Sequence, residues 1–315
     1  MYLTERHQRA MGSDAQVLVY AATQGAADEL ARLALVRVQL LEQCWSRFRP
    51  DSELNLLNDR AGQGPVSVSP DLEALVATML QAAAWTDGVY DPTVLGAVRA
   101  NGYDADFAEV IARDSLRAID DLLAPSLGTA GIVIDRGQHT VSLPSGVGID
   151  PGAIGKGLAA DIVADEIHAA GAEGILVNLG GDVSVRGTAG GSDWTVGIQD
   201  DRVAGSPVMR QMELNGDCRA VATSSSLRRR WNGRHHVIDP ITGQPSQSDL
   251  AQVTVAAPHG WQAEAATTYA LVRGSRAATD WLQAHSLEAL LFPHDPASPA
   301  LRVSQPLRVR ETHHV

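Results

Sequence analysis

Apolar residues near the start of the chain follow first a strand pattern and then a helical one. The segment AQVLVYA (15–21) is rich in β-branched and apolar residues and is bounded by polar ones, which predicts a strand. From Ala27, apolar residues recur at helical spacing through ADELARLALVRVQLLEQCWSRF and predict a long helix. A second helix is expected from Pro70, which suits a first helical turn, to the stop signal Asp87-Gly88.

The middle of the chain predicts two more helices and a hairpin. DADFAEVIARDSLRAID (104–120) is a helical candidate, and GIVID (131–135) with HTVSL (139–143) has the pattern of a β-hairpin. A further helix is expected from Ile154 to about Ala170.

The last part of the chain is dominated by short strands. Five of them follow one another: GILVN (174–178), VSVRG (183–187), WTVGIQ (194–199), VMRQMEL (208–214) and RAVATS (219–224). The remaining elements are expected to be a strand QVTVAAP (252–258), helices over Ala263–Val272 and Ala277–His285, and a strand LEALLF (287–292). Consecutive short strands favour antiparallel pairing, so the predicted class is α+β, with mainly antiparallel strands and packed helices.

Segments of Pro, Ser and polar residues bear on domain organisation. PHDPASPA (293–300) and the end RETHHV (310–315) are expected to be loop and tail, and no low-complexity linker divides the sequence. We therefore expect residues 1–315 to form a single domain, or two intimately joined subdomains.

Composition and charge exclude several functions. A formal net charge of -12 disfavours a nucleic-acid surface, and the one basic cluster is Arg228-Arg229-Arg230. Cys44 and Cys218 lack metal-ligand spacing and are expected to be buried thiols. No apolar run is long enough for a membrane span, and the first residues lack an apolar signal-peptide core, so a cytoplasmic location is expected.

The stretch VGIDPGAIGKGLAADIVADEI (147–167) has the ingredients of an anion site. It is not a nucleotide-hydrolase phosphate loop, because Asp150 stands where that motif has its first glycine and Gly157 stands where it has Ser or Thr. Its glycines nevertheless allow close approach of a ligand to the backbone, and a helix start offers free N–H groups. Lys156 is therefore a candidate ligand of an anion.

Three other segments carry candidate chemistry, each with a structural alternative. Gly180-Gly181 in VNLGGDVSVRG (177–187) has the pattern of a hairpin turn, and HHVIDPITGQP (235–245) that of a turn beside two histidines. Glu264 and Thr268 are four residues apart on an expected helix, where two oxygen atoms could bind a hard cation such as Mg2+. The alternative for Glu264 is a solvated surface charge.

Ten segments, taken in order, resemble one known family. They are MGSDAQVLV, DSELNLLND, YDPTV, GIDPGAIGKGLAAD, LVNLGGDVSVRG, WTVGIQD, VATSSSLRRRW, HHVIDPITGQP, VTVAAP and AEAATTYAL. Together, from residue 11 to about residue 274, they resemble the ApbE family of FAD:protein FMN transferases. The resemblance implies a T-fold-like α+β core.

The resemblance also implies an activity. It implies binding of FAD in a cleft, a requirement for Mg2+, and transfer of FMN from FAD to a Ser or Thr hydroxyl of a target protein, with release of AMP. The target would carry the flavinylation sequence Asp-x-x-Ser/Thr-Gly-Ala-Ser/Thr. Two alternatives remain open: a Mg2+-dependent FAD pyrophosphatase that yields FMN and AMP, and a non-catalytic FAD-binding protein.

Residue roles follow from the resemblance position by position. Lys156 would face the FAD pyrophosphate and act in catalysis, His236 would assist as a base, and the metal ligands would be the Ala153 carbonyl and the side chains of Glu264 and Thr268. The implied FAD contacts are Met11, Tyr90, Asp91, Asp150, Lys156, Asn178, Gly180, Gly181, Asp182, Thr223, Ser224 and Asp239. The alternatives are a core position for Met11 and turns or helix caps for Asp150 and Asp239.

Three positions depart from the family pattern. Glu264 stands where the family usually has Asp, so the ion or the helix would have to shift to accommodate a longer side chain. Ser225 replaces the glycine of Thr-Ser-Gly, and Gly155 replaces the alanine of Ala-Lys-Gly.

Overall fold

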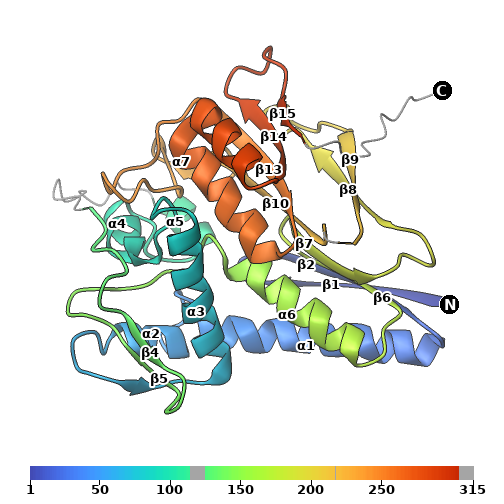
Figure 1. Ribbon diagram of the computed structural model, residues 1–315, viewed down its shortest axis with the longest axis horizontal. Helices are drawn as coiled ribbons and strands as arrows, with labels where there is room; N and C mark the ends of the chain where they lie inside the picture. The colour runs from blue at the N-terminus through green and yellow to red at the C-terminus, as the bar shows by residue number, and fades with distance from the viewer. Residues whose placement is uncertain (114–124, 217, 305–315) are drawn as a thin grey trace. The chain divides into compact units, whose positions relative to one another are not determined.

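The computed structural model describes residues 1–113, 125–216 and 218–304 (Figure 1). The chain divides into two compact units. Unit 1 comprises Met1–Gln39, Lys156–Arg228 and Ser248–Val315, and unit 2 comprises Leu40–Gly155 and Arg229–Gln247. Whether they act as a single domain or as two joined subdomains stays a prediction.

Unit 1 is built on one large sheet. Its strands are β1 (Tyr2–Ala10), β2 (Ser13–Ala21), β6 (Gly174–Leu179), β7 (Asp182–Gly187), β10 (Ala220–Ser225), β13 (Leu250–Ala257), β14 (Glu288–Pro293) and β15 (Leu301–Val303). They form an eight-stranded sheet in the order β1-β2-β6-β7-β10-β13-β14-β15, in which every neighbouring pair is antiparallel. The predicted α+β class with mainly antiparallel strands is confirmed.

Both faces of this sheet are covered. Against one face packs the antiparallel hairpin of β8 (Trp194–Gln199) and β9 (Val208–Leu214), and the core there includes Leu176, Val185, Trp194, Met212, Val221 and Phe292. Helix α7 (Gly260–Ala284) contacts β10 and β13 (Figure 1), and all eight residues of β13 are buried. Burial on both faces explains why β6 and β13 have continuous apolar runs rather than alternating patterns.

Helices of unit 1 match the expected segments. Helix α1 (Gln24–Trp45), whose larger part belongs to this unit, and α6 (Gly155–Ala169) agree with the predictions to within about three residues. Helix α7 has two helical stretches separated at Gly274, whose φ of 79° is outside the helical range, as the two predicted helices require. Asp249 Oδ1 accepts a hydrogen bond from the Ser275 N–H (2.8 Å) and so caps the second stretch.

Strand β1 was not expected from the sequence. It pairs with β2 along its whole length, and the tight turn between them holds Met11 and Gly12 at φ 50° and 66°. Because β1 is an edge strand and most of its side chains are exposed, its sequence lacks the apolar signal of the inner strands. The same reason applies to the short edge strand β15.

Unit 2 contains short helices and small sheets. Its elements are α2 (Glu53–Asn58), α3 (Pro70–Trp85), a 3₁₀ turn (Pro92–Val94), α4 (Leu95–Ala100), α5 (Phe107–Ala112), β3 (Val66–Ser67), β4 (Val133–Asp135), β5 (Thr140–Ser142), β11 (Arg230–Trp231) and β12 (Arg234–His235). The hairpin of β4 and β5 is confirmed, as is α3, whose first turn is capped by the Ser69 hydroxyl. Of the predicted helix over 104–120, α5 is described; residues 114–120 and the predicted tail 310–315 lie outside the described residues.

The helices and the two cysteines bear on the expectations from composition. Among the helices within the described residues, none combines the length and the apolar character that crossing a membrane requires. Cys44 and Cys218 are half-buried free thiols, and burial raises their pKa to about 12 and about 11. A raised pKa lowers the thiolate fraction on which the reactivity of a thiol depends.

Candidate active site

Lys156 lies between two buried carboxylates of unit 1. It is the second residue of α6, and its Nζ donates to Asp182 Oδ2 and, at 2.9 Å, to Glu264 Oε1. Asp182 begins β7 and Glu264 lies in the second turn of α7, and each residue is 2% exposed. We call Lys156, Asp182 and Glu264 the Lys–Asp–Glu cluster.

Glu264 is a core residue of unit 1. Its Oε2 accepts a hydrogen bond from the Gly157 N–H at 2.8 Å, one residue after the lysine that contacts Oε1. Burial raises the pKa of Glu264 to about 7, the Lys156 ammonium opposes this effect, and the Asp182 carboxylate adds to it. The alternative of a solvated surface charge is wrong for this residue.

Two glycines explain how α6 and α7 bring these side chains together. A Cβ atom on Gly157 would lie 2.3 Å from the Gly260 carbonyl oxygen, and one on Gly260 would lie 2.4 Å from the Gly157 carbonyl oxygen. The first turns of the two helices therefore touch through bare backbone (Figure 1). The glycine after Lys156 serves this helix contact.

The carboxylate oxygens of the cluster are suited to binding a hard cation. Asp182 Oδ1 is buried and has no hydrogen-bond partner among the described residues, and one ammonium faces two carboxylates. Carboxylate oxygen is a preferred ligand of Mg2+. In the described part of the chain no three His, Cys, Asp or Glu side chains are grouped as a metal site, so two carboxylates would need other oxygen ligands beside them.

The turn before Asp182 is the hairpin that its glycines suggest. Gly180 and Gly181 have φ of 69° and 102°, and Asn178 Oδ1 accepts the Gly181 N–H at 2.9 Å. A Cβ on Gly180 would lie 2.6 Å from Ser13 Cβ, so this turn is close to the β1–β2 turn. Met11 is half-buried in that β1–β2 turn, and its predicted flavin contact stays a prediction.

Hydroxyl groups link β10 to α7 beside the cluster. Ser224 Oγ donates to Thr267 Oγ1 (2.7 Å), because the Thr267 hydroxyl proton is directed to the Glu264 carbonyl oxygen (2.7 Å). Thr223 forms a hydroxyl pair with Thr254 at 2.9 Å. Thr268, the predicted metal ligand, is half-buried, and its role stays a prediction.

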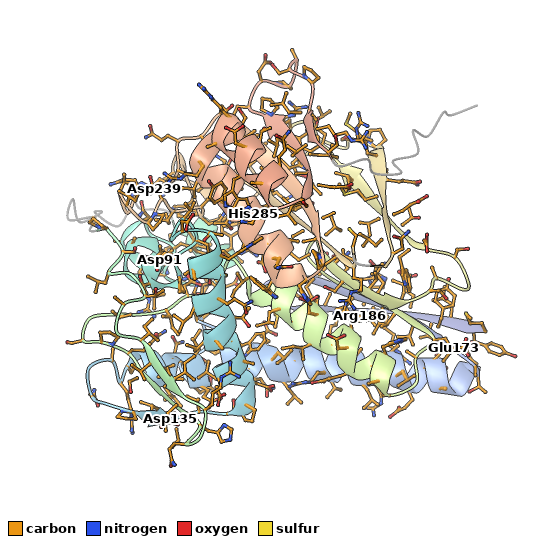
Figure 2. The ribbon with its side chains drawn as sticks, in the orientation of Figure 1. Asp91, Asp135, Glu173, Arg186, Asp239 and His285 are labelled. Atoms are coloured by element: carbon orange, nitrogen blue, oxygen red, sulfur yellow. The ribbon has the colours of Figure 1, made fainter. Side chains whose placement is uncertain are left out.

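Asp91 and Asp239 of unit 2, both labelled in Figure 2, have turn or cap roles. Asp91 Oδ1 caps the 3₁₀ turn through the Thr93 N–H (2.8 Å), and its Oδ2 accepts the Ser126 hydroxyl, while the Ser126 N–H reaches the Pro240 carbonyl. Asp239 Oδ1 accepts the Ile241 N–H at 2.9 Å, as expected of a turn carboxylate.

Asp150 and the remaining candidates also belong to unit 2. The Asp150 carboxylate pairs with Arg47 Nε (3.2 Å) and accepts the Gly152 N–H (2.8 Å), which is the turn role left open by the sequence. Tyr90 is buried, Ala153 lies in the turn before α6, and His236 follows β12. The predicted metal site combines Ala153 of unit 2 with Glu264 and Thr268 of unit 1, and it stays a prediction.

The sheet topology defines an antiparallel α+β protein, and the half-buried Lys156 at the N-terminus of α6 marks a candidate anion site. The chain belongs to the ApbE family, whose model matches residues 11–291. It is 32% identical over 254 residues to the FAD:protein FMN transferase of Treponema pallidum, covering 75% of this chain and 69% of that protein. It is 31% identical over 259 residues to the FAD:protein FMN transferase of Escherichia coli K12, covering 80% and 73%.

A solved structure agrees with the fold. The crystal structure of an ApbE protein from Thermotoga maritima superposes with a TM-score of 0.82 at 25% identity and covers 96% of this chain and 97% of that chain. The flavin transferase ApbE from Vibrio cholerae has the same fold, with a TM-score of 0.76 at 22% identity. The family indicated by the sequence motifs is confirmed.

Proposed function

We propose that this protein is an FAD:protein FMN transferase that moves FMN from FAD to a Ser or Thr hydroxyl of a target protein and releases AMP. Family membership and the names of the relatives support this activity. The single observation in this chain that carries it is the Lys–Asp–Glu cluster, in which an ammonium of the kind that can bind phosphate lies beside carboxylates suited to a metal. FAD is thus the substrate, and Mg2+ is the expected cofactor.

The proposed reaction exchanges one P–O bond for another. The target hydroxyl oxygen bonds to the phosphorus on the FMN side of the pyrophosphate, and the bond from that phosphorus to the bridging oxygen breaks. The bridging oxygen leaves with AMP, and the hydroxyl proton passes to a base, for which His236 is the candidate. Mg2+ would neutralise the charge that develops on the phosphate oxygens.

This chain's own groups have distinct proposed tasks. Lys156, together with N–H groups at the start of α6, would bind the pyrophosphate oxygens. Glu264 and Thr268, with the Ala153 carbonyl, would hold the cation, and the orphaned Asp182 Oδ1 supports a cation at this place. The proposed flavin and adenosine contacts remain Met11, Tyr90, Asp91, Asp150, Asn178, Gly180, Gly181, Asp182, Thr223, Ser224 and Asp239.

The test uses the full chain with FAD and Mg2+. AMP is measured by chromatography, and covalent flavin is measured by mass spectrometry of a target protein carrying Asp-x-x-Ser/Thr-Gly-Ala-Ser/Thr. We expect AMP and target-bound FMN in equal amounts, and neither when the acceptor Ser or Thr of the target is replaced by Ala. AMP without any target would indicate a pyrophosphatase, and FAD binding without AMP would indicate a binding protein; either result would overturn the proposal.

A further inference from the structure

We propose that Asp161 is a positioning residue, which fixes the N-terminus of α7 on α6 and thereby holds Glu264 at Lys156. Asp161 lies on α6 five residues after Lys156 and is 5% exposed. All contacts that support the positioning role lie within unit 1. Its consequence for catalysis rests on the proposed function.

One carboxylate oxygen of Asp161 caps α7. Its Oδ2 accepts hydrogen bonds from the N–H groups of Gly260 (2.8 Å) and Trp261 (3.4 Å), the first two residues of that helix. These N–H groups have no partner within their own helix, and the N-cap residue, His259, makes no side-chain cap. The cap is therefore supplied by a residue 99 positions away in the sequence.

The other oxygen is fixed by β7. Asp161 Oδ1 accepts the Ser184 hydroxyl at 2.8 Å and lies 3.6 Å from Nη2 of Arg186, which is labelled in Figure 2. Burial raises the pKa of Asp161, and the Gly260 N–H, Ser184 and Arg186 all oppose this effect. Hydrogen bonds on both oxygens leave this carboxylate little freedom to move.

The contacts between α6 and β7 form a regular series. Lys156 meets Asp182, Asp161 meets Ser184, and Asp165 meets Arg186 through Nε at 2.6 Å. Residues 182, 184 and 186 alternate along one strand and therefore point to the same side of the sheet. The strand that holds Asp161 in place is the same strand that supplies Asp182 to the cluster.

The glycine contact cannot fix α7 by itself. Gly157 and Gly260 permit close approach of the two backbones, but they supply no directional side-chain bond. The Asp161 carboxylate supplies that bond at Gly260, four residues before Glu264, which is one helical turn away. Without this bond, the first turn of α7 is free to fray. The Glu264 carboxylate is then no longer held in hydrogen-bonding distance of the Gly157 N–H and Lys156 Nζ.

The test compares Asp161→Asn with Asp165→Asn. Asparagine has the shape of aspartate but only one acceptor oxygen, so its N–H₂ group has to face either the Gly260 N–H or the Arg186 guanidinium, both of which are donors. Asp165 is a matched control because it lies one turn further along α6 and pairs with the same Arg186, yet its side chain is 62% exposed. Ser184→Ala is a milder variant, since it removes the hydrogen bond that holds Oδ1 and so leaves the capping oxygen Oδ2 less firmly oriented.

The first measurement needs no ligand. Hydrogen exchange in the full chain without FAD and Mg2+ should be faster at residues 260–264 in Asp161→Asn than in Asp165→Asn or wild type, with Ser184→Ala in between. Unchanged exchange in a folded Asp161→Asn protein would overturn the proposal, and so would acceleration spread evenly over the chain. If Asp161→Asn does not fold, Ser184→Ala decides in the same way.

The second measurement is the Mg2+ concentration for half-maximal AMP release. We expect it to rise about tenfold in Asp161→Asn and to change less than about twofold in Asp165→Asn, because groups that orient ligands typically affect metal affinity by such factors. A wild type that releases no AMP would refute the proposed function, and the exchange result would still decide the role of Asp161. A faster exchange with unchanged Mg2+ dependence would refute its link to the active site.

Discussion

Gly157 and Gly260 touch through their backbones, since a Cβ on Gly157 would lie 2.3 Å from the Gly260 carbonyl oxygen. Backbone cannot move aside as a flexible side chain does, so Gly157→Ala should destabilise the protein by about 3 kcal/mol. It should also weaken FAD binding, because Lys156 is the preceding residue. Urea denaturation and an FAD titration measure the two effects.

The control for this substitution is Gly25→Ala. Gly25 is also helical, and a Cβ there would meet nothing within 4 Å. It should be neutral or stabilise by up to about 1 kcal/mol through helix propensity. Similar stability of the two variants would mean that the contact between α6 and α7 is looser than described.

Lys156→Ala should lower stability as well as FAD affinity. A lysine between two glycines has little apolar surface to bury, so the local sequence alone predicts little effect on folding. Its ammonium, however, pairs with Asp182 and Glu264, which are 3% and 2% exposed at their side chains. Loss of one partner from a buried ion pair costs about 3 kcal/mol.

A double-mutant cycle checks this interpretation. Adding Asp182→Asn to Lys156→Ala should recover part of the lost stability, because one uncompensated carboxylate disappears. Urea denaturation at pH 8 is the measurement. Additive losses would argue that Lys156 and Asp182 do not interact in solution.

Substitutions of Glu264 separate charge from length. Glu264→Gln should raise the Mg2+ concentration for half-maximal AMP release by about tenfold or more, whereas Glu264→Asp should retain or improve Mg2+-dependent activity. Glu166→Gln is a control, since Glu166 forms a surface pair with Arg37 and is 47% exposed. A Gln variant as active as wild type would remove Glu264 from the metal site.

Glu288 should make stability fall as pH rises. It begins β14, its Oε2 is buried without a partner among the described residues, and burial raises its pKa to about 7 against the opposing charge of Arg302. The folded state thus binds the Glu288 proton more tightly than the unfolded state, so its contribution is lost between about pH 4.5 and pH 7. Glu288→Gln should therefore raise the Tm relative to wild type more at pH 8 than at pH 5.

Thermal unfolding at both pH values gives the comparison. Glu29→Gln is the control of opposite sign, because a hydrogen bond from Arg32 lowers the pKa of Glu29. An equal change in Tm at pH 5 and pH 8 for Glu288→Gln would show that this carboxyl keeps an ordinary pKa.

Asp150→Asn should distinguish a structural carboxylate from a ligand of FAD. Asp150 and Arg47 are each 7% exposed at their side chains, and the Arg47 guanidinium lies over the rings of Phe48 (4.1 Å) and Tyr103 (4.3 Å). The substitution should therefore cost about 3 kcal/mol of stability. FAD affinity is measured below the unfolding transition. Unchanged affinity would mean that Asp150 has a structural role only, whereas a large loss of affinity in a variant as stable as wild type would support direct contact with FAD.

Local sequence determined most of the elements. Ser69 and Pro70 fix the start of α3, the apolar runs of β6 and β13 mark inner strands, and Gly274 separates the two helical stretches of α7. These signals act over a few residues through capping, periodicity and backbone preference, so they are readable without the fold. Strand β1 was missed because its pairing, not its own apolar content, makes it a strand.

The glycine-lysine stretch could be recognised from sequence, but the partners of its lysine could not. Glu264 is 108 residues from Lys156, and Asp161 caps a helix that begins 99 residues later. The sequence also could not distinguish a surface Glu264 from a buried one. The burial of Glu264 and the partners of Lys156 depend on how closely α6 approaches α7 and on the position of β7 beside them. Only the tertiary packing of unit 1 decides these arrangements.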